Sequence, residues 1–556
     1  MTANAKTTST TGLRPIAEIA AGLGLADEEW EPYGRWIGKV EPGLLAKPRK
    51  RPGAGRLVLV SAITPTPAGE GKTTTSIGLA QALAKLGESA CLALREPSLG
   101  PCMGIKGGAT GGGASTIGPA DRINLHFTGD FHAITSANNL LAAMLDNSIY
   151  FGNPLGIDPR RILWRRCIDM NDRALRRTVI GLGGHKEGVP RETGFDITAA
   201  SEVMAMLCLA ENEDDLRERI DRTLVAFTYD GEPVTAKSLN ASGAMVALLR
   251  DALKPNLVQT IEGVPAFVHG GPFANIAHGC NSIVATRLAL HLADWAVTEA
   301  GFAFDLGAEK FFDIKSRAAG LDTACVVLVA TIRALKYHGG VDLKQLASPD
   351  PEAVRRGLPN LEKHIESIHH FGEVPVVALN RFGDDDDGEI EVVRARCREL
   401  GVQFAVSDHF ARGGEGAIEL ARTVLEYAER HGEPFHPLYE LDAPIPDKVL
   451  AVASKMYGAK SVVLTKTAER DLKDIRRLGY ENLPICIAKT QNSLSDDPRL
   501  KGRPQEFEVT VRELHISAGA GFVVVLTGEI LRMPGLPRRP LAEGIDLVDG
   551  EIVGLA

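Results

Sequence analysis

The 556-residue sequence contains no long apolar run and no closely spaced cysteines, and its basic residues are fewer than its acidic ones. A membrane-spanning helix needs about 20 consecutive apolar residues, and no stretch approaches that length. The first 12 residues are rich in Thr, Ser and Ala and lack the apolar core of a secretory signal. We therefore expect a frayed N-terminal tail and a cytoplasmic protein with no membrane partner.

The eight cysteines are scattered along the chain, and no two have Cys-x-x-Cys spacing. This pattern favours reduced, mostly buried thiols over a disulfide framework or a zinc site. The cysteines are Cys91, Cys102, Cys167, Cys208, Cys280, Cys325, Cys397 and Cys486.

The formal net charge is −9, from 62 Lys and Arg against 71 Asp and Glu. A general nucleic-acid binder carries a basic field over its working face, so nucleic acid is not an expected partner. An anionic small substrate remains compatible, because a local cluster of Lys, Arg and backbone N–H groups can override the global sign. The composition is that of an ordinary globular protein, and a chain of this length divides into two to four domains.

A strand, a loop and a helix follow one another early in the chain. Residues 57–63 are apolar with β-branched side chains interleaved, which predicts a buried strand. After a Gly- and Pro-rich loop, residues 74–86 carry apolar side chains at helical spacing, and residues 90–94 predict a second short strand. Such a βαβ unit favours a parallel sheet with a ligand site at the strand ends.

The loop at residues 64–73 reads Thr-Pro-Thr-Pro-Ala-Gly-Glu-Gly-Lys-Thr. A phosphate-binding loop needs small residues whose N–H groups converge on phosphate oxygens, then a Lys and a Ser or Thr at the start of a helix. We expect Lys72 to reach the β- and γ-phosphates of ATP, the Thr73 hydroxyl to bind Mg²⁺, and the amides from Gly69 to Thr73 to cradle the phosphates. The alternative is an ordinary Gly-rich turn, since Thr66 stands where the usual first glycine would be. The expected ATP-binding residues are Thr66, Pro67, Ala68, Gly69, Glu70, Gly71, Lys72 and Thr73.

The alternation of strands and helices continues to the C-terminus. The predicted fold class is therefore α/β, with a P-loop-containing parallel sheet domain and two further α/β domains, at residues 1–295, 296–450 and 451–556. Strands are expected at residues 178–182, 324–329, 374–379, 402–406, 461–464, 485–488, 506–510 and 522–526. Helices are expected at residues 197–209, 214–227, 389–400 and 416–431.

Arg95 follows the second strand of the βαβ unit and leaves the sheet at the same edge as the phosphate loop. Its planar guanidinium suits an acyl phosphate or a transferring phosphoryl group better than an ammonium would. The alternative is a surface or ion-paired arginine.

A glycine cluster at residues 104–113 follows, and so many glycines let the backbone approach a ligand closely. It leads into residues 124–132, which mix apolar anchors with the titratable His126, Asp130 and His132. Either histidine alone could equally be a core residue. The acidic run Asp384–Asp387 predicts a solvated loop before a helix, with a metal site as the weaker alternative.

Several long and chemically unusual segments occur in order along nearly the whole chain, and together they resemble formate–tetrahydrofolate ligases. Besides the phosphate loop they are Arg95–Pro101, Gly104–Gly108, Asn124–His132, Pro190–Ile197, Thr298–Phe302, Val329–Gly340, Ala488–Pro498 and Met533–Pro537. The sequence departs from the family pattern at Thr110 and Ala114, which stand for an Ala and a Tyr, and at Phe410, which stands for a Trp.

The resemblance implies that ATP phosphorylates formate and that N10 of tetrahydrofolate attacks the formyl phosphate, giving 10-formyltetrahydrofolate, ADP and phosphate. It also implies that Arg95 binds the formyl-phosphate oxygens and that the pterin stacks between Phe382 and Phe410, with residues 296–450 contributing to the folate site. His126, Asp130 or His132 would then accept the N10 proton. ATP with Mg²⁺ is the expected nucleotide, a monovalent cation such as K⁺ is compatible, and a homotetramer is the expected assembly.

Two other classes fit parts of the sequence. A P-loop NTPase that acts as a switch would leave the second glycine cluster and the C-terminal segments unexplained. A paralogue that has lost catalysis and only binds folate or nucleotide stays open because of Ala114 and Phe410. A fused dehydrogenase/cyclohydrolase is disfavoured, since the ligase-like region leaves no spare length.

Overall fold

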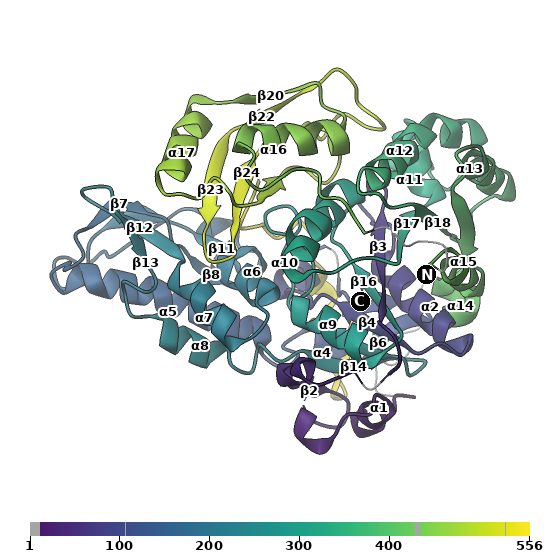
Figure 1. Ribbon diagram of the computed structural model, residues 1–556, viewed down its shortest axis with the longest axis horizontal. Helices are drawn as coiled ribbons and strands as arrows, with labels where there is room; N and C mark the ends of the chain where they lie inside the picture. Colours follow the sequence, from purple (N-terminus) through teal and green to yellow (C-terminus); the bar gives the residue numbers. More distant parts are fainter. Residues whose placement is uncertain (1–11, 50, 106, 429–433, 529, 556) are drawn as a thin grey trace.

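The computed structural model describes residues 12–49, 51–105, 107–428, 434–528 and 530–555. Its centre is a large sheet to which twelve of the strands in these residues belong, with helices on both faces (Figure 1). The structure is therefore a mixed α/β fold with a mainly parallel central sheet, and the predicted fold class is confirmed.

Seven neighbouring strands of this sheet run parallel. In sheet order they are β15 (Pro265–Val268), β4 (Ala90–Leu94), β16 (Trp295–Glu299), β3 (Arg56–Ala62), β17 (Cys325–Ala330), β18 (Pro375–Asn380) and β19 (Gln403–Ser407). An antiparallel edge beyond β15 consists of β14 (Asn256–Thr260), β2 (Gly38–Val40) and β1 (Trp30–Pro32). Strand β6 (Ser115–Gly118) also pairs with β14, and β5 (Gly111–Gly112) pairs with β6. Because β4, β16 and β3 are adjacent and parallel, the segments that follow them leave the sheet side by side.

Helices cover the two faces of the sheet. They include α2 (Lys72–Lys85), α9 (Ile283–Leu292), α11 (Ile332–His338), α12 (Pro351–His369), α13 (Asp387–Glu399), α14 (His409–Gly416) and α15 (Ile418–Ala428). In β3, Val58 belongs to one core together with side chains of α2 and α15, whereas Leu59 belongs to the other core with side chains of α9 and α12. Burial on both faces explains why these strands read as continuous apolar runs.

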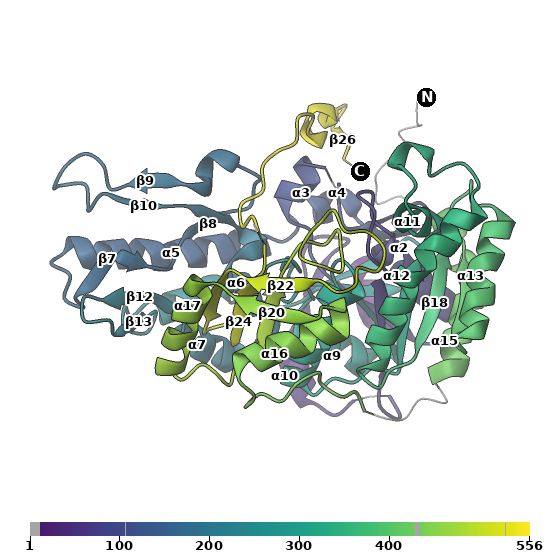
Figure 2. The ribbon, with the colours of Figure 1, turned by 90° about the horizontal axis from the view of Figure 1, so that it is seen from above.

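Residues 130–249 form an arm beside the sheet (Figure 1, left). The arm contains α5 (Asp130–Tyr150), β7 (Ile157–Ile162), β8 (Arg166–Ile168), β9 (Thr178–Ile180), β10 (Arg191–Thr193), β11 (Phe195–Ile197), α6 (Glu202–Leu209), α7 (Glu213–Asp221), β12 (Leu224–Thr228), β13 (Pro233–Thr235) and α8 (Ser242–Leu249). The hairpin of β9 and β10 projects from the body of the molecule (Figure 2).

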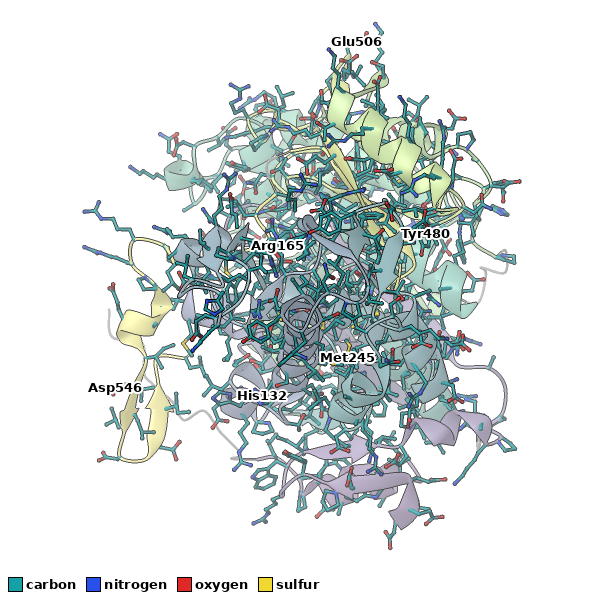
Figure 3. The ribbon with its side chains drawn as sticks, turned by 90° about the vertical axis from the view of Figure 1, so that its left-hand side faces the viewer. His132, Arg165, Met245, Tyr480, Glu506 and Asp546 are labelled. Atoms are coloured by element: carbon teal, nitrogen blue, oxygen red, sulfur yellow. The ribbon has the colours of Figure 1, made fainter. Side chains whose placement is uncertain are left out.

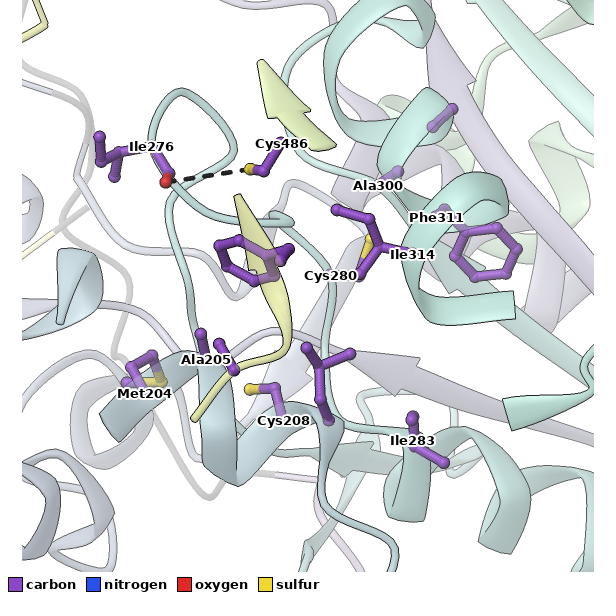
Figure 4. Close-up of a cluster of buried hydrophobic side chains, with 14 of the residues drawn as sticks. Met204, Ala205, Cys208, Ile276, Cys280, Ile283, Ala300, Phe311, Ile314 and Cys486 are labelled. Carbon is purple, nitrogen blue, oxygen red and sulfur yellow. Dashed lines mark hydrogen bonds between the residues drawn. The ribbon is translucent and has the colours of Figure 1, made fainter. Parts of the chain in front are cut away.

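The C-terminal region lies against both the arm and the sheet (Figure 1, top). It contains α16 (Ile445–Val452), β20 (Ser461–Leu464), α17 (Lys466–Arg477), β21 (Ile485–Ala488), β22 (Glu508–Val511), β23 (Glu513–Ser517) and β24 (Phe522–Leu526). Its core is continuous with the rest, since Cys486 of β21 clusters with Ile276 and with Cys208 of α6 (Figure 4). The predicted boundary at residue 295 falls on the first residue of β16, in the middle of the sheet. The division into three α/β domains stays a prediction.

Two of the predicted helices are partly wrong. The helix expected at 214–227 ends at Asp221, and Leu224–Thr228 is a strand that pairs with β13 and β7. Its apolar run of Leu, Val, Ala and Phe is buried on both sides, which suits a strand. The helix expected at 197–209 begins only at Glu202, because the Ser201 hydroxyl caps it by accepting from the Met204 N–H at 3.2 Å.

The helix expected at 416–431 is α15, and residues 429–431 lie outside the described part of the chain. Residues 1–11 of the expected tail also lie outside it. All eight cysteines are buried and free, as predicted. None of the helices in the described ranges is long and apolar enough to cross a membrane.

Candidate active site

The phosphate loop joins β3 to α2, and its backbone requires glycine at one position in particular. Gly71 has a φ of 77°, in the left-handed region, immediately before the first residue of α2. A Cβ at this position would lie 2.5 Å from Nδ2 of Asn380, at the end of β18. The same amide nitrogen donates to the Glu70 carbonyl at 3.1 Å, so β18 holds the loop from the side.

The loop amides that face outward are fewer than the sequence suggested. The Gly69 N–H donates to the Thr66 carbonyl at 3.0 Å, so it is already engaged inside the loop. Within the described residues, the N–H groups of Glu70, Gly71, Lys72 and Thr73 have no assigned acceptor. These four amides at a helix N-terminus form the available phosphate cradle.

Glu70 braces the loop from inside. Its buried carboxylate accepts from the Thr66 N–H at 2.6 Å and from the Thr331 hydroxyl. Burial raises the pKa of Glu70 above its ordinary value, although the Thr331 and Thr66 hydrogen bonds oppose the shift. The Glu70 side chain therefore points away from the nucleotide side, and its backbone is the part that can meet a phosphate.

A buried carboxylate lies at the centre of the charged groups around the loop. Glu299, the last residue of β16, is 2% exposed. It accepts from the Thr73 hydroxyl at 2.7 Å and lies 3.6 Å from Nε of Arg95. The sheet order β4, β16, β3 brings these three residues together, because each follows or ends one of three adjacent parallel strands.

Glu299 has no role in the sequence prediction. The available signal was an acidic residue at the end of a buried apolar strand, within Thr298–Phe302. Its place beside Thr73 and Arg95 depends on β16 lying between β4 and β3, and the order of strands in a sheet cannot be read from a short stretch of sequence.

Lys72 and Arg95 both interact electrostatically with this carboxylate. Burial lowers the pKa of the Lys72 ammonium, Glu299 opposes the shift, and Arg95 adds to it. No hydrogen bond or ion pair is assigned to the Lys72 ammonium among the described residues. The Arg95 side chain is 24% exposed, and its Nε is buried without a hydrogen-bond acceptor. Arg95 is thus an ion-paired and partly exposed arginine, which is compatible with the alternative expectation, and its role toward an anionic ligand stays a prediction.

The three expected proton acceptors have no direct contact with this cluster among the described residues. His126 and His132 are exposed, and Figure 3 shows His132 on the side of the molecule that carries the arm. Asp130 is buried, pairs with Lys39 at 2.9 Å and accepts from Nδ2 of Asn256 at 2.7 Å. No contact joins any of the three to Lys72, Arg95 or Glu299 in the described structure, so the structure does not bring them together and their role stays a prediction.

The two expected folate-stacking rings follow neighbouring strands. Phe382 lies two residues after β18, and the Arg333 guanidinium stacks on its ring at 4.3 Å from the centroid. Phe410 lies three residues after β19 and is 53% exposed. The Ala114 N–H donates to the Phe410 carbonyl at 2.8 Å, and a Cβ on Gly112 would meet the Phe410 ring at 3.0 Å. The absence of a side chain at Gly112 therefore lets the backbone of the glycine cluster pack closely against Phe410.

The acidic run is a loop that leads into a helix, as predicted. Asp386 caps α13 by accepting from the Gly388 N–H at 2.8 Å, and Asp384 pairs with Arg333 at 2.7 Å. No group of three or more His, Cys, Asp or Glu side chains suited to a metal ion occurs in the described ranges.

A Gly-rich loop between β3 and α2, with charged side chains at the carboxyl ends of three adjacent parallel strands, is the arrangement of an α/β protein with a ligand site at that edge of its sheet. The family model for formate–tetrahydrofolate ligase matches residues 2–556, and the chain belongs to this family. It is therefore a ligase, and the family implies ATP-dependent joining of formate and tetrahydrofolate. This result favours the ligase over the nucleotide switch.

Proposed function

We propose that the chain makes 10-formyltetrahydrofolate through a formyl phosphate formed at the cluster of Lys72, Arg95 and Glu299. The observation that carries the proposal is that Lys72 and Arg95 both interact with the buried Glu299, beside four loop amides that have no acceptor among the described residues. Phosphoryl transfer depends mainly on positioning and on charge stabilisation, and both are supplied here by groups fixed at strand ends.

In the first half-reaction a formate oxygen attacks the γ-phosphorus of ATP, the bond to the β–γ bridging oxygen breaks, and ADP leaves. Lys72 and the amides of Glu70 to Thr73 hold the phosphates, and Arg95 holds the transferring group. In the second half-reaction N10 attacks the formyl carbon, phosphate leaves with its electron pair, and N10 loses its proton. Arg95 contacts the same phosphoryl oxygens in both halves, so the intermediate need not move between them.

The residues also fit a magnesium ion. The Thr73 hydroxyl and the Glu299 carboxylate are hard oxygen donors 2.7 Å apart beside the phosphate cradle, and they would hold Mg²⁺. When bound, Mg²⁺ neutralises charge on the β- and γ-phosphates. Folate would stack at Phe382 and Phe410. A homotetramer is the proposed assembly, and a monovalent cation such as K⁺ is compatible with the site.

Formyl phosphate with Mg-ADP, in the absence of folate, tests the intermediate. The expected result is ATP formation, because the first half-reaction then runs in reverse. The overall reaction is followed in parallel with tetrahydrofolate, formate and Mg-ATP, each omitted in turn, and the product is converted by acid to methenyltetrahydrofolate. Overall synthesis without ATP formation from formyl phosphate would exclude the two-step route, and ADP release that needs neither formate nor folate would exclude the ligase.

A further inference from the structure

Thr64 is the residue at which the chain leaves β3 and enters the phosphate loop. The preceding Ile63 N–H still donates to Val329 of the neighbouring strand at 3.0 Å. Thr64 is 1% exposed, and its N–H, carbonyl and hydroxyl are all bound by side chains of α11 and α12. The start of the loop is thus fixed by side chains, not by the sheet.

Three side chains make these bonds. The Thr64 N–H donates to Nε2 of His364 at 2.9 Å, and Nε2 of His338 lies 2.9 Å from the Thr64 carbonyl. Nδ2 of Asn360 donates to the Thr64 hydroxyl at 3.0 Å. Since a buried backbone polar group costs free energy when unpaired, each bond fixes the position of the chain at this point.

The same His338 and Asn360 side chains bind Gly502 of the C-terminal region on their other side. The Gly502 N–H donates to Nδ1 of His338 at 3.1 Å, and Nδ2 of Asn360 also donates to the Gly502 carbonyl at 2.8 Å. Because Nδ1 accepts, the proton of the neutral His338 ring is on Nε2, which then donates to Thr64. Each side chain therefore bridges Thr64 and Gly502.

The bridge is buried and uncharged. His338 is 6% exposed, and Asn360 and His364 are fully buried. Burial lowers the pKa of His338 and of His364 to about 4, so both rings are neutral near pH 7. The flanking residues of Gly502 are attached to the same helices, because Lys501 lies 3.9 Å from the Tyr337 ring centroid and Arg503 forms a two-pronged ion pair with Glu366.

We propose that His338 and Asn360 are positioning residues that hold the entrance of the phosphate loop in its ATP-binding position by tying Thr64 to Gly502. This inference rests on the proposed role of the loop in binding ATP. The C-terminal region, which supplies no residue to the Lys72–Arg95–Glu299 cluster, thereby contributes to nucleotide binding.

Two substitutions of His338 separate the halves of the bridge. In His338→Gln the side-chain amide can reach the position of Nε2 and donate to Thr64, whereas in His338→Asn the amide oxygen can take the place of Nδ1 and accept from Gly502. We expect His338→Asn to raise the KM for ATP about tenfold, on the scale of one lost buried hydrogen bond. His338→Gln, which keeps the bond to Thr64 and loses the bond to Gly502, should raise the KM for ATP as well, because the bridge needs both bonds. Asn360→Asp, which loses both donors, should behave like His338→Asn, with kcat less affected than KM.

The assay uses the full-length chain at a temperature well below the melting point of each variant, with Mg-ATP varied at saturating formate and tetrahydrofolate. Arg503→Gln is the matched control, since it loosens the same segment without touching Thr64, and its KM for ATP should be that of the wild type. A wild-type KM for ATP in either His338 variant, or an equal rise in Arg503→Gln, would overturn the inference. The variant Lys72→Ala distinguishes a failure of this inference from a failure of the proposed function. If Lys72→Ala binds Mg-ATP normally, the loop is not the ATP site. If Lys72→Ala binds Mg-ATP poorly but His338→Asn binds it normally, only the inference about the bridge is rejected.

Discussion

Glu299 shows how one residue can unite a site assembled from three strands. Its carboxylate is buried, accepts a hydrogen bond from the Thr73 hydroxyl, and interacts with two cations, Lys72 and Arg95. A charge removed from water in this way persists only with compensating partners. Its placement beside the phosphate cradle makes it the residue whose alteration best tests the arrangement.

We expect Glu299→Gln to lower kcat/KM by about 10²- to 10³-fold, on the scale of a lost preorganised charge, and to raise the Mg²⁺ concentration needed for half-maximal activity. The measurement is steady-state synthesis across a Mg²⁺ titration. Glu88→Gln is the matched control, because Glu88 accepts from the Trp295 indole N–H at 3.0 Å at the opposite end of the same strand. If the activity of Glu299→Gln depends on Mg²⁺ as that of the wild type does, Glu299 is not a ligand of the metal.

Lys72 predicts a pH dependence. Burial lowers its pKa below the ordinary value of 10.5. The ammonium is charged below its pKa, so ATP binding is fully supported at low pH and is lost as the pH rises through that lowered pKa. We expect kcat/KM for ATP, which reports the free enzyme, to fall on the alkaline side with an apparent pKa below 10.5. In Lys72→Arg, whose guanidinium stays charged, this limb should disappear; an unchanged limb would assign the titration to another group.

At the scale of the element, the strand–loop–helix unit is held by a few backbone requirements. The turn into α2 depends on Gly71, whose conformation few other residues adopt, and on the contact of that turn with Asn380. Gly69 also has a positive φ, of 84°, but a Cβ there would meet no atom within 4 Å. Substitutions at the two glycines therefore distinguish the effect of backbone strain, which both positions share, from the effect of a steric clash, which only Gly71 has.

Gly71→Ala and Gly69→Ala should therefore differ. Both carry the cost of a left-handed alanine, about 1 kcal/mol. Only Gly71→Ala also forces Asn380 away, which shifts the amides of Lys72 and Thr73. We expect at least a tenfold weaker binding of Mg-ATP in Gly71→Ala and less than a threefold change in Gly69→Ala, by isothermal titration calorimetry. Equal losses of Mg-ATP affinity in the two variants would mean that backbone strain alone, and not the contact with Asn380, determines the loop conformation.

The local elements were predictable because their signals are local. The first βαβ unit follows from apolar periodicity and from the loop composition, and β20, β21 and β24 occupy the ranges expected from their apolar runs. Strand β12 was missed because its apolar run follows a charged helix after only Arg222 and Thr223. Glu299 and the Thr64 bridge were missed for another reason, since they join residues more than 200 positions apart in the chain.

At the scale of the whole molecule, the last part of the chain runs back from the C-terminal region to the body that carries the site (Figure 2). The segment around Met533 contacts the arm, since the Ile197 N–H donates to the Arg532 carbonyl at 2.9 Å and Nε of Arg176 donates to the Met533 carbonyl at 2.9 Å. Farther on, the Leu541 N–H donates to the Gly104 carbonyl at 2.8 Å, in the glycine cluster. A cavity of about 1000 Å³ lies beside this segment, and Arg173, Arg176 and Pro534 are among its lining residues.

The final hairpin differs from this segment in its contacts. Strands β25 (Asp546–Val548) and β26 (Glu551–Val553) pair with each other, and Figure 3 shows the hairpin at Asp546 standing away from the body. Every residue of β25 is exposed, whereas Met533 is buried. The hairpin therefore adds little to the stability of the chain, and the segment from Ile530 to Leu541 adds much more.

Two truncations test this difference. Ending the chain after Gly544 removes the hairpin and should leave the melting temperature within about 1 °C, as expected for exposed residues outside a packed core. Ending it after Gly528 removes the buried Met533, the Arg532–Asp196 ion pair and the Leu541 bond to Gly104. The loss of a buried Met and of one of the two arginine partners of the buried Asp196 carboxylate should destabilise the fold by about 3–5 kcal/mol. Scanning calorimetry should show a fall of several degrees for the shorter chain alone, and equal melting temperatures would mean that the returning segment is a passive tail.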